Sequence, residues 1–399
     1  MKIVHVADYL MPQFGYQEFL LPVWNAKHGH EVHIVTSDRY TPIESYETLW
    51  EPLIGPRIVG TGLSLIKGVQ VHRLPVHFEF RLRAWIDGLE KYLEELAPDV
   101  LFVHLNENIT ACRCARIATK LNVPVFVDNH SVMGSLNPNF VGKFGRVCLR
   151  FLMRNLQQSA VDKFIGVSED SCRVLEKVYE IPASKVEYLP LGVDTEMFKF
   201  STEARSAIRA ELGIPEDAFV VMQTGKLDEC KRPDWLAAAM EPLMRGDENI
   251  YCVYVGGFSN PMRLQVQEIL SECSGRLKVH APVQVDQLSS MMSAADVVVY
   301  PNATSMSAVE AASCRRSVIM ADWPASIDRE ASGIGMCYRT GDIADLTSQI
   351  SKLSSELDVR EALESRSYNA VFQHYSYDAV ASQSEALMLD AINERKSGF

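Results

Sequence analysis

The chain has no long apolar segment and no excess of basic residues. No apolar stretch approaches the roughly 18 residues that a membrane-spanning helix requires, so we expect no transmembrane segment. Met1–Ala7 enters a strand-like pattern directly, and we expect no signal peptide. Acidic residues outnumber basic ones by 51 to 39, and the formal net charge is −12. This balance argues against a general nucleic-acid-binding protein.

Motifs that define several common sites are also absent. The nine cysteines are scattered, and no pair has the C-x-x-C spacing typical of zinc ligands. We therefore expect no metal site, and reduced thiols as in a cytoplasmic protein. No G-x-G-x-x-G follows a predicted strand, and no G-x-x-x-x-G-K-[ST] is present. These absences disfavour a dehydrogenase and a P-loop nucleotidase.

What the sequence does contain is a regular alternation of short and long patterned segments. Short β-branched runs alternate with longer amphipathic runs, which is typical of α/β domains with parallel sheets. We expect strands at residues 2–7, 31–37, 69–74, 99–105, 123–128, 163–167, 185–189, 219–224, 251–256, 277–281, 297–300, 317–321 and 336–338. Helical patterns include residues 17–27, 108–121, 203–212 and 234–243, and a long one begins at Tyr375.

The length of the chain and the position of a segment with glycine and proline predict two domains. A chain of 399 residues with 47% hydrophobic content can build two cores. Glycine and proline in Pro190–Asp194 stop a strand without starting a helix, as expected of a hinge. We therefore predict a first domain at residues 1–192 and a second at residues 193–375, followed by a helix at residues 376–399.

The most informative segment is Tyr300–Ser313. A buried strand pattern ends at Tyr300, a small polar loop follows, and a helical pattern then begins. Backbone N–H groups at such a helix start, here around Ser305, Met306 and Ser307, favour an anion. Glu310 adds an acceptor for sugar hydroxyls. The alternative is a capping box, in which Ser307 and Glu310 satisfy each other's backbone donors.

This segment resembles the carboxy-terminal domain of the family 4 retaining glycosyltransferases. That family has the GT-B architecture: two α/β, Rossmann-like domains facing each other across a cleft, with the last helix crossing back onto the first domain. Its members carry two glutamates with seven residues between them, and here only the second is present. The resemblance implies that Glu310 binds the nucleotide ribose and that Asn302 stands where the first glutamate would touch the donor sugar.

A basic loop strengthens the resemblance. Thr224–Pro233 follows a predicted strand and contains Lys226 and Lys231. The family has a glycine, a basic residue and a lysine at this spacing, and both cations hold the diphosphate. Such cations stabilise a leaving nucleoside diphosphate as it gains charge. The alternative is a charged, solvated turn.

Two positions in the first half fit the same family. Gly15 lies between the first strand and helix, where glycine lets the backbone approach a phosphate, although Tyr16 replaces the second glycine that family members usually show. The alternative is an ordinary turn. His130 ends a strand, at the sheet edge where such folds bind ligands. The family places a histidine there beside the donor sugar.

Further positions rest on the resemblance more indirectly. Gly256 and Gly257 resemble the family's glycine turn beside the nucleotide base, with a plain tight turn as the alternative. Val283 stands where family members contact the base through their backbone.

A basic helical face is the last candidate. Lys143, Arg146, Arg150 and Arg154 share one face of a helical pattern. Such a face can rest on anionic lipid at the inner side of the cell membrane. A solvated face packed against the first domain is the alternative.

The resemblance implies transfer of a hexose from a nucleotide diphosphate sugar to an acceptor hydroxyl, with retained anomeric configuration. It also implies that no metal is required and that the setting is surface polysaccharide or glycolipid assembly. The donor nucleotide (uridine, guanosine or adenosine) stays open. Three alternatives remain: a GT-B nucleotide-sugar epimerase, a partner that binds nucleotide sugar without turnover, and a binding domain for a non-sugar nucleotide.

Overall fold

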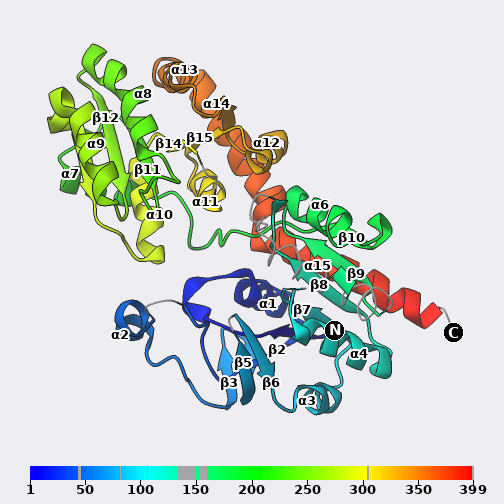
Figure 1. Ribbon diagram of the computed structural model, residues 1–399. Coiled ribbons are helices and arrows are strands. Elements are labelled where there is room, and N and C mark those ends of the chain that lie inside the picture. Colours follow the sequence, from blue (N-terminus) through cyan, green and yellow to red (C-terminus); the bar gives the residue numbers. More distant parts are fainter. Residues whose placement is uncertain are drawn as a thin grey trace. The chain divides into compact units, whose positions relative to one another are not determined.

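The computed structural model divides the chain into two compact units, each built around a twisted sheet (Figure 1). It describes residues 1–43, 46–80, 82–105, 107–133, 150–151, 160–302 and 305–397. The first unit comprises Met1–Gly192 and Tyr377–Phe399, and the second comprises Val193–Ser376. The sequence predicts a domain boundary between residues 192 and 193. The two structural units divide between Gly192 and Val193.

The first unit contains an eight-stranded sheet in the order β10-β9-β8-β7-β1-β2-β4-β3. All neighbouring strands are parallel except β3, which pairs antiparallel with β4 at the edge. The strands are β1 (Lys2–Ala7), β2 (Glu31–Ser37), β3 (Gly62–Ile66), β4 (Val69–Leu74), β7 (Val100–Val103), β8 (Val125–Asn129), β9 (Lys163–Gly166) and β10 (Val186–Tyr188).

Helices cover both faces of this sheet. Alternate residues of β1 enter different cores: Ile3 packs with α1 and α15, whereas Val4 packs with α3, α4 and α6. This is the two-sided burial expected of parallel sheets. The helices are α1 (Gln17–Lys27), α2 (Glu51–Ile54), α3 (Leu89–Leu96), α4 (Ile109–Leu121), α6 (Glu169–Lys177) and α15 (Tyr377–Ser397), with short turns η1 (Pro12–Phe14), η2 (Tyr46–Trp50) and η4 (Ala183–Lys185).

A two-stranded hairpin, β5 (Val76–Phe80) and β6 (Arg83–Ile86), follows β4. Its inner face buries Ala84 and Ile86, while Phe78 and Phe80 are about 60% exposed on the outer face. The hydroxyl of Tyr9, just after β1, donates a hydrogen bond to Glu79 at 2.6 Å. The hairpin thus lies at the carboxyl edge of the first sheet.

The second unit contains a six-stranded parallel sheet in the order β13-β12-β11-β14-β15-β16. The strands are β11 (Phe219–Thr224), β12 (Ile250–Val255), β13 (Leu277–His280), β14 (Val297–Tyr300), β15 (Ser317–Ala321) and β16 (Met336–Tyr338). The helices are α7 (Thr202–Leu212), α8 (Pro233–Gly246), α9 (Asn260–Ile269), α10 (Val285–Ala294), α11 (Ser307–Ser313), α12 (Pro324–Ala331), α13 (Ile343–Ser355) and α14 (Leu357–Ala370), with η5 (Ser271–Arg276) and η6 (Val371–Tyr375).

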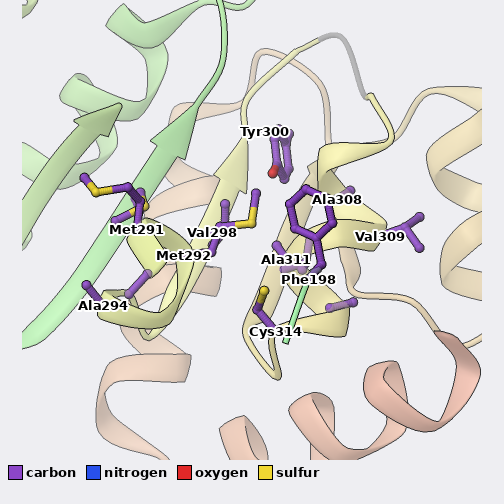
Figure 2. Packing of buried hydrophobic residues seen from close by; sticks show 14 of the residues in the cluster. Phe198, Met291, Met292, Ala294, Val298, Tyr300, Ala308, Val309, Ala311 and Cys314 are labelled. Carbon is purple, nitrogen blue, oxygen red and sulfur yellow. The ribbon is translucent and has the colours of Figure 1, made fainter. Parts of the chain in front are cut away.

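Two cores sandwich the second sheet. Val298 and Tyr300 of β14 pack toward α10 and α11, whereas Val297 and Val299 pack toward α8 and α13. Figure 2 shows the first of these cores, with Phe198 beside the α11 residues Ala308 and Ala311. Small residues on α11 let the helix lie close to β14, and this close packing fixes where the helix begins.

The predicted α/β class and parallel sheets are confirmed. Seven predicted strands have the bounds that the structure shows, namely β1, β2, β4, β11, β14, β15 and β16. The final helix begins at Tyr377 rather than Tyr375, because residues 371–375 form the wider turn η6. Within the described residues, no helix has both the length and the hydropathy needed to cross a bilayer.

Candidate functional site

The connection from β14 to α11 has the form that the sequence predicted, but the capping-box alternative is wrong. Met306 occupies the position before the helix with φ −60° and ψ −21°, and its side chain makes no cap bond. Ser307 is therefore the first helical residue. The Ser307 side chain hydrogen-bonds instead to the carboxyl group of Glu310 in the first turn and to Tyr300 at the end of β14.

Glu310 is a half-buried carboxyl group in the first turn of α11. Burial raises its pKa to about 7, and the hydrogen bond from Ser307 opposes this rise. Near neutral pH the group is thus divided between its charged and neutral forms. A carboxylate in this state gains from ligand hydroxyls, which replace the water that it has lost.

The basic loop after β11 holds Lys226 and Lys231 in different environments. The Lys226 side chain is 80% exposed, and its Nζ lies 3.1 Å from Asp228 Oδ2. Lys231 is half-buried, and its burial lowers the pKa of the ammonium group, with Asp228 acting in the opposite direction. The charge of Lys231 is therefore less screened by water than that of Lys226.

Arg329 of α12 is a cation that the sequence analysis missed. Its Nη1 donates to the Ser305 carbonyl at 3.1 Å, and its Nη2 lies 3.7 Å from Met306 Sδ. Its charge also acts on Lys231. Two cations and the start of α11 thus come together in the second unit. No local sequence motif predicts the position of Arg329, because it reaches this loop through the packing of α12.

Asn302 connects three segments of the second unit. Its Nδ2 donates to the Cys230 carbonyl at 2.9 Å, and its Oδ1 accepts from Trp323 Nε1 at 3.1 Å. A glutamate at this position has no donor for the Cys230 carbonyl. The asparagine therefore fastens the basic loop to the end of β14 and to the segment before α12.

Gly256 is required by the fold itself. At φ +147°, an added Cβ would lie 1.8 Å from the Gly225 carbonyl oxygen. The ends of β11 and β12 approach each other there, and the Gly225 N–H donates to Val255 at 3.0 Å. Gly257 is less constrained, because an added Cβ there would lie 3.7 Å from the nearest atom, in Pro282. Val283 is half-buried against the core beneath α11.

Gly15 and His130 lie in the first unit. Gly15 ends η1 at φ +63°, one residue before the cap of α1. His130 follows β8 at the carboxyl edge, and its Nε2 lies 3.4 Å from Asp128 Oδ2. Burial lowers the pKa of His130, but Asp128 and Glu18 outweigh it, so the pKa lies above its ordinary value.

The surroundings of His130 include ionisable groups that the sequence analysis did not single out. His104, at the end of β7, bonds to Asp128 at 2.7 Å, and the carboxyl group of Glu18 on α1 interacts electrostatically with both imidazoles. The rule that selected His130, a histidine at the carboxyl end of a parallel strand, also selects His104. Glu18 carries no such signal.

The structure therefore gathers Lys231, Asn302, Ser305, Met306 and Glu310 in the second unit and places Gly15 and His130 in the first. Arg150 forms an ion pair with Glu180 at 2.8 Å. The other members of the predicted basic face, Lys143, Arg146 and Arg154, lie outside the described residues.

Family models match both units. The model described as "Glycosyltransferase Family 4" matches residues 25–197, and the one described as "Glycosyl transferases group 1" matches residues 218–356. A D-inositol 3-phosphate glycosyltransferase from Xylanimonas cellulosilytica is 30% identical over 41% of this chain and 41% of its own length. One from Saccharomonospora viridis is 27% identical over 60% of this chain and 57% of its own. The match thus spans about two fifths to three fifths of these relatives.

Solved structures support the fold over the full length. Anabaena Alr3699/HepE in complex with UDP has a TM-score of 0.70 at 14% identity, covering 98% of this chain and 100% of that one. Sucrose-phosphate synthase (tll1590) from Thermosynechococcus elongatus has a TM-score of 0.66 at 15% identity, covering 99% and 100%. The two family models together match most of the chain, and they show that it is a glycosyltransferase of the family 4 type; the solved structures show that it has the GT-B fold.

Proposed function

We propose that this chain transfers a hexose from a nucleotide diphosphate sugar to an acceptor hydroxyl with retention of anomeric configuration. The observation that carries the proposal is the group of Lys231, Arg329 and Glu310 around the start of α11. Cations and backbone N–H groups suit a diphosphate, and a carboxyl group suits ribose hydroxyls. The structures of HepE with UDP and UDP-glucose support a nucleotide-sugar donor.

In this account, each unit supplies part of the chemistry. Lys231 and Arg329 stabilise the diphosphate as the glycosidic bond breaks, since positioned cations matter most where charge develops. Lys226 adds a weaker, solvent-screened charge. Gly15 lets backbone approach the phosphates, and His130 contacts the donor sugar. The acceptor is a glycan, a glycolipid or a small molecule, and surface polysaccharide or glycolipid assembly is the setting that we propose.

Because side chains supply the positive charge, we also propose that transfer requires no metal ion. Chelation with EDTA should then change the transfer rate by less than about two-fold, whereas a metal-dependent transferase loses most of its rate.

Titration calorimetry with UDP, GDP and ADP tests the donor site. Lys231→Ala should weaken binding of the preferred nucleotide about 10- to 100-fold, the range for a charged hydrogen bond. Lys226→Ala should have a smaller effect, because an exposed ion contributes little. Lys352→Ala, an exposed lysine on α13, is the control. Equal affinities for the Lys231 and Lys352 variants would refute this assignment.

A second candidate is a partner that binds nucleotide sugar without turnover. The bonds of Asn302 to Cys230 and Trp323 favour it, because the amide that replaces the family glutamate is occupied by protein contacts. Tight donor binding with no release of nucleoside diphosphate, across many acceptors, would select this candidate.

A further inference from the structure

A file of buried polar side chains crosses the first unit from α15 to the carboxyl edge of the sheet. Asn25, His5 and Asp128 are fully buried, and His104 is 4% exposed. The proposed function uses only the last member, His130. In order, the members are Glu385, Asn25, His5, His104, Asp128 and His130. Because buried polar groups are paired, each contact indicates where a hydrogen atom lies.

Glu385 fixes the orientation of the Asn25 amide. A carboxylate only accepts hydrogen bonds, so Asn25 Nδ2 must be the atom that donates to Glu385, at 2.7 Å. Asn25 Oδ1 then faces His5 Nε2 at 3.2 Å and can only accept. His5 therefore carries a hydrogen on Nε2.

Asp128 determines where the hydrogen lies at the other end of this file. Its Oδ1 accepts from the Leu105 N–H at 2.6 Å, and its Oδ2 lies 2.7 Å from His104 Nδ1. Burial would raise the pKa of Asp128, but His130 and His104 hold it well below its usual range. Asp128 is thus ionised, and His104 Nδ1 carries the hydrogen of this bond.

The central contact joins the two histidines. His5 Nδ1 lies 3.2 Å from His104 Nε2, and one hydrogen must lie between them for a bond to form. With the outer nitrogens already donating, the pair carries three hydrogens on four nitrogens, which means one imidazolium. Burial and the charge of His104 lower the pKa of His5 well below its ordinary value. The charge therefore resides on His104, beside Asp128.

We propose that Glu385, Asn25 and His5 are positioning residues that hold His104 as an imidazolium, so that His104 takes up much of the Asp128 charge and limits the positive charge on His130. The role rests on the proposed function, in which His130 contacts the donor sugar. Asp128 is shared unequally, since its Oδ2 is 2.7 Å from His104 and 3.4 Å from His130. His130 is kept closer to a neutral imidazole than Asp128 alone would leave it.

Other charged groups also face this file. Glu18 of α1 interacts with His104, His130 and Asp128. At the far end, Glu385 also contacts His28 at 3.0 Å and His30 at 3.5 Å.

The first test needs no substitution and no donor. Nitrogen-15 NMR of the histidine-labelled protein at neutral pH should show hydrogens on both ring nitrogens of His104 and on Nε2 alone of His5. A His104 with one bare nitrogen at neutral pH would overturn the proposal.

The second test measures the pKa of His130 in variants. His5→Phe removes the acceptor for His104 Nε2, so His104 should become neutral. The negative charge of Asp128 is then no longer offset by His104, and the pKa of His130 should rise by about 0.5–1 unit. His104→Asn keeps a donor to Asp128 without the charge and should give the same rise. His33→Phe is the matched control, because His33 Nδ1 contacts His72 Nε2 at 2.8 Å in the same manner. An unchanged His130 pKa in both His5→Phe and His104→Asn would contradict the proposal.

Activity separates this proposal from the proposed function. If the chain is a transferase, the His130 limb of the kcat/KM pH profile should move with the pKa in His5→Phe and stay in place in His33→Phe. A loss of fold alone would lower kcat at every pH without moving the limb. If the NMR result holds and no transfer occurs, the proposed function fails and the histidine arrangement stands.

Discussion

The half-buried carboxyl group of Glu310 should favour ligand binding and lower the stability of the protein without ligand. Its carboxyl group is half-buried at the start of α11, and burial raises its pKa to about 7. An ionised carboxylate there has lost much of its water without gaining a charged partner. A ligand hydroxyl would restore those interactions. If Glu310 binds ribose as we propose, we therefore expect it to destabilise the protein when no ligand is bound.

Glu310→Gln should accordingly stabilise the protein in a pH-dependent way. Folding raises the pKa from roughly 4.3 to about 7, so the folded chain retains a proton that the unfolded chain loses, and stability falls as pH rises through this interval. At pH 8 the variant should melt ~2–4 °C higher, for a gain of about 1 kcal/mol, which is well below the full value of the pKa shift because water partly screens the half-buried carboxyl group. At pH 4 the difference should vanish. A gain that is equal at both pH values would show that ionisation is not its cause.

Candidate residues were found by sequence where one local pattern carried the signal. Lys231 and Glu310 each lie in the segment that follows a predicted strand, and His130 comes directly after β8. Arg329 reaches Ser305 only because α12 packs beside the loop, and a single sequence does not report such packing. The Ser307 capping box failed because Met306 had already adopted helical angles.

The loops at the carboxyl edge of the second sheet are held by backbone contact as well as by side chains. The end of β12 meets the end of β11 at Gly256, and Asn302 fastens the basic loop to β14. Contacts of this kind can hold cations in place before a ligand arrives, which reduces the entropy lost on binding.

Gly256→Ala should destabilise the second unit strongly. A Cβ would meet the Gly225 carbonyl at 1.8 Å, and the φ of +147° is unfavourable for alanine. We expect a loss of about 2–4 kcal/mol in the free energy of unfolding, measured by urea denaturation. Gly246→Ala is the control: this glycine lies in α8 with no atom within 4 Å of an added Cβ, and the change should be neutral or slightly stabilising. Similar effects of the two substitutions would refute the close approach.

Among the elements, buried strands were predicted well and exposed ones were missed. β11 and β14 are almost completely buried runs rich in valine, the pattern that parallel sheets produce. β3 escaped notice because its apolar residues point outward: Leu63 and Leu65 are 63% and 73% exposed. The hairpin of β5 and β6 was missed because its short strands mix buried and exposed apolar residues: Ala84 and Ile86 are buried, whereas Phe78 and Phe80 are exposed. In β3 and on the outer face of the hairpin, apolar residues do not mark the core.

At the scale of the whole molecule, the first unit is discontinuous in sequence. Helix α15 returns to it after the entire second unit, and Val380 and Met388 of α15 join the core that contains Ile3 and Phe102. Its Glu385 also orients Asn25. Helix α15 is therefore part of the first unit's core and of its buried polar file.

Met388→Asp tests this dependence. Met388 is fully buried in the first unit, and an unpaired charge there should cost about 3–5 kcal/mol. Thermal unfolding should show the transition of the first unit lowered and that of the second little changed. Leu389→Asp, at a side chain 44% exposed on the same helix, should leave both transitions in place. Equal losses in both variants would contradict the assignment of α15 to this core.

The most direct test of the whole account is a turnover measurement with a panel of UDP-, GDP- and ADP-hexoses and hydroxyl acceptors. It would follow nucleoside diphosphate release together with the anomeric configuration of the product by NMR. We predict that one donor releases its nucleoside diphosphate in step with product formation, that the product keeps the donor's configuration, and that Lys231→Ala and Glu310→Gln lose this activity. A product of inverted configuration, or donor binding with no release by any member of the panel, would contradict the account.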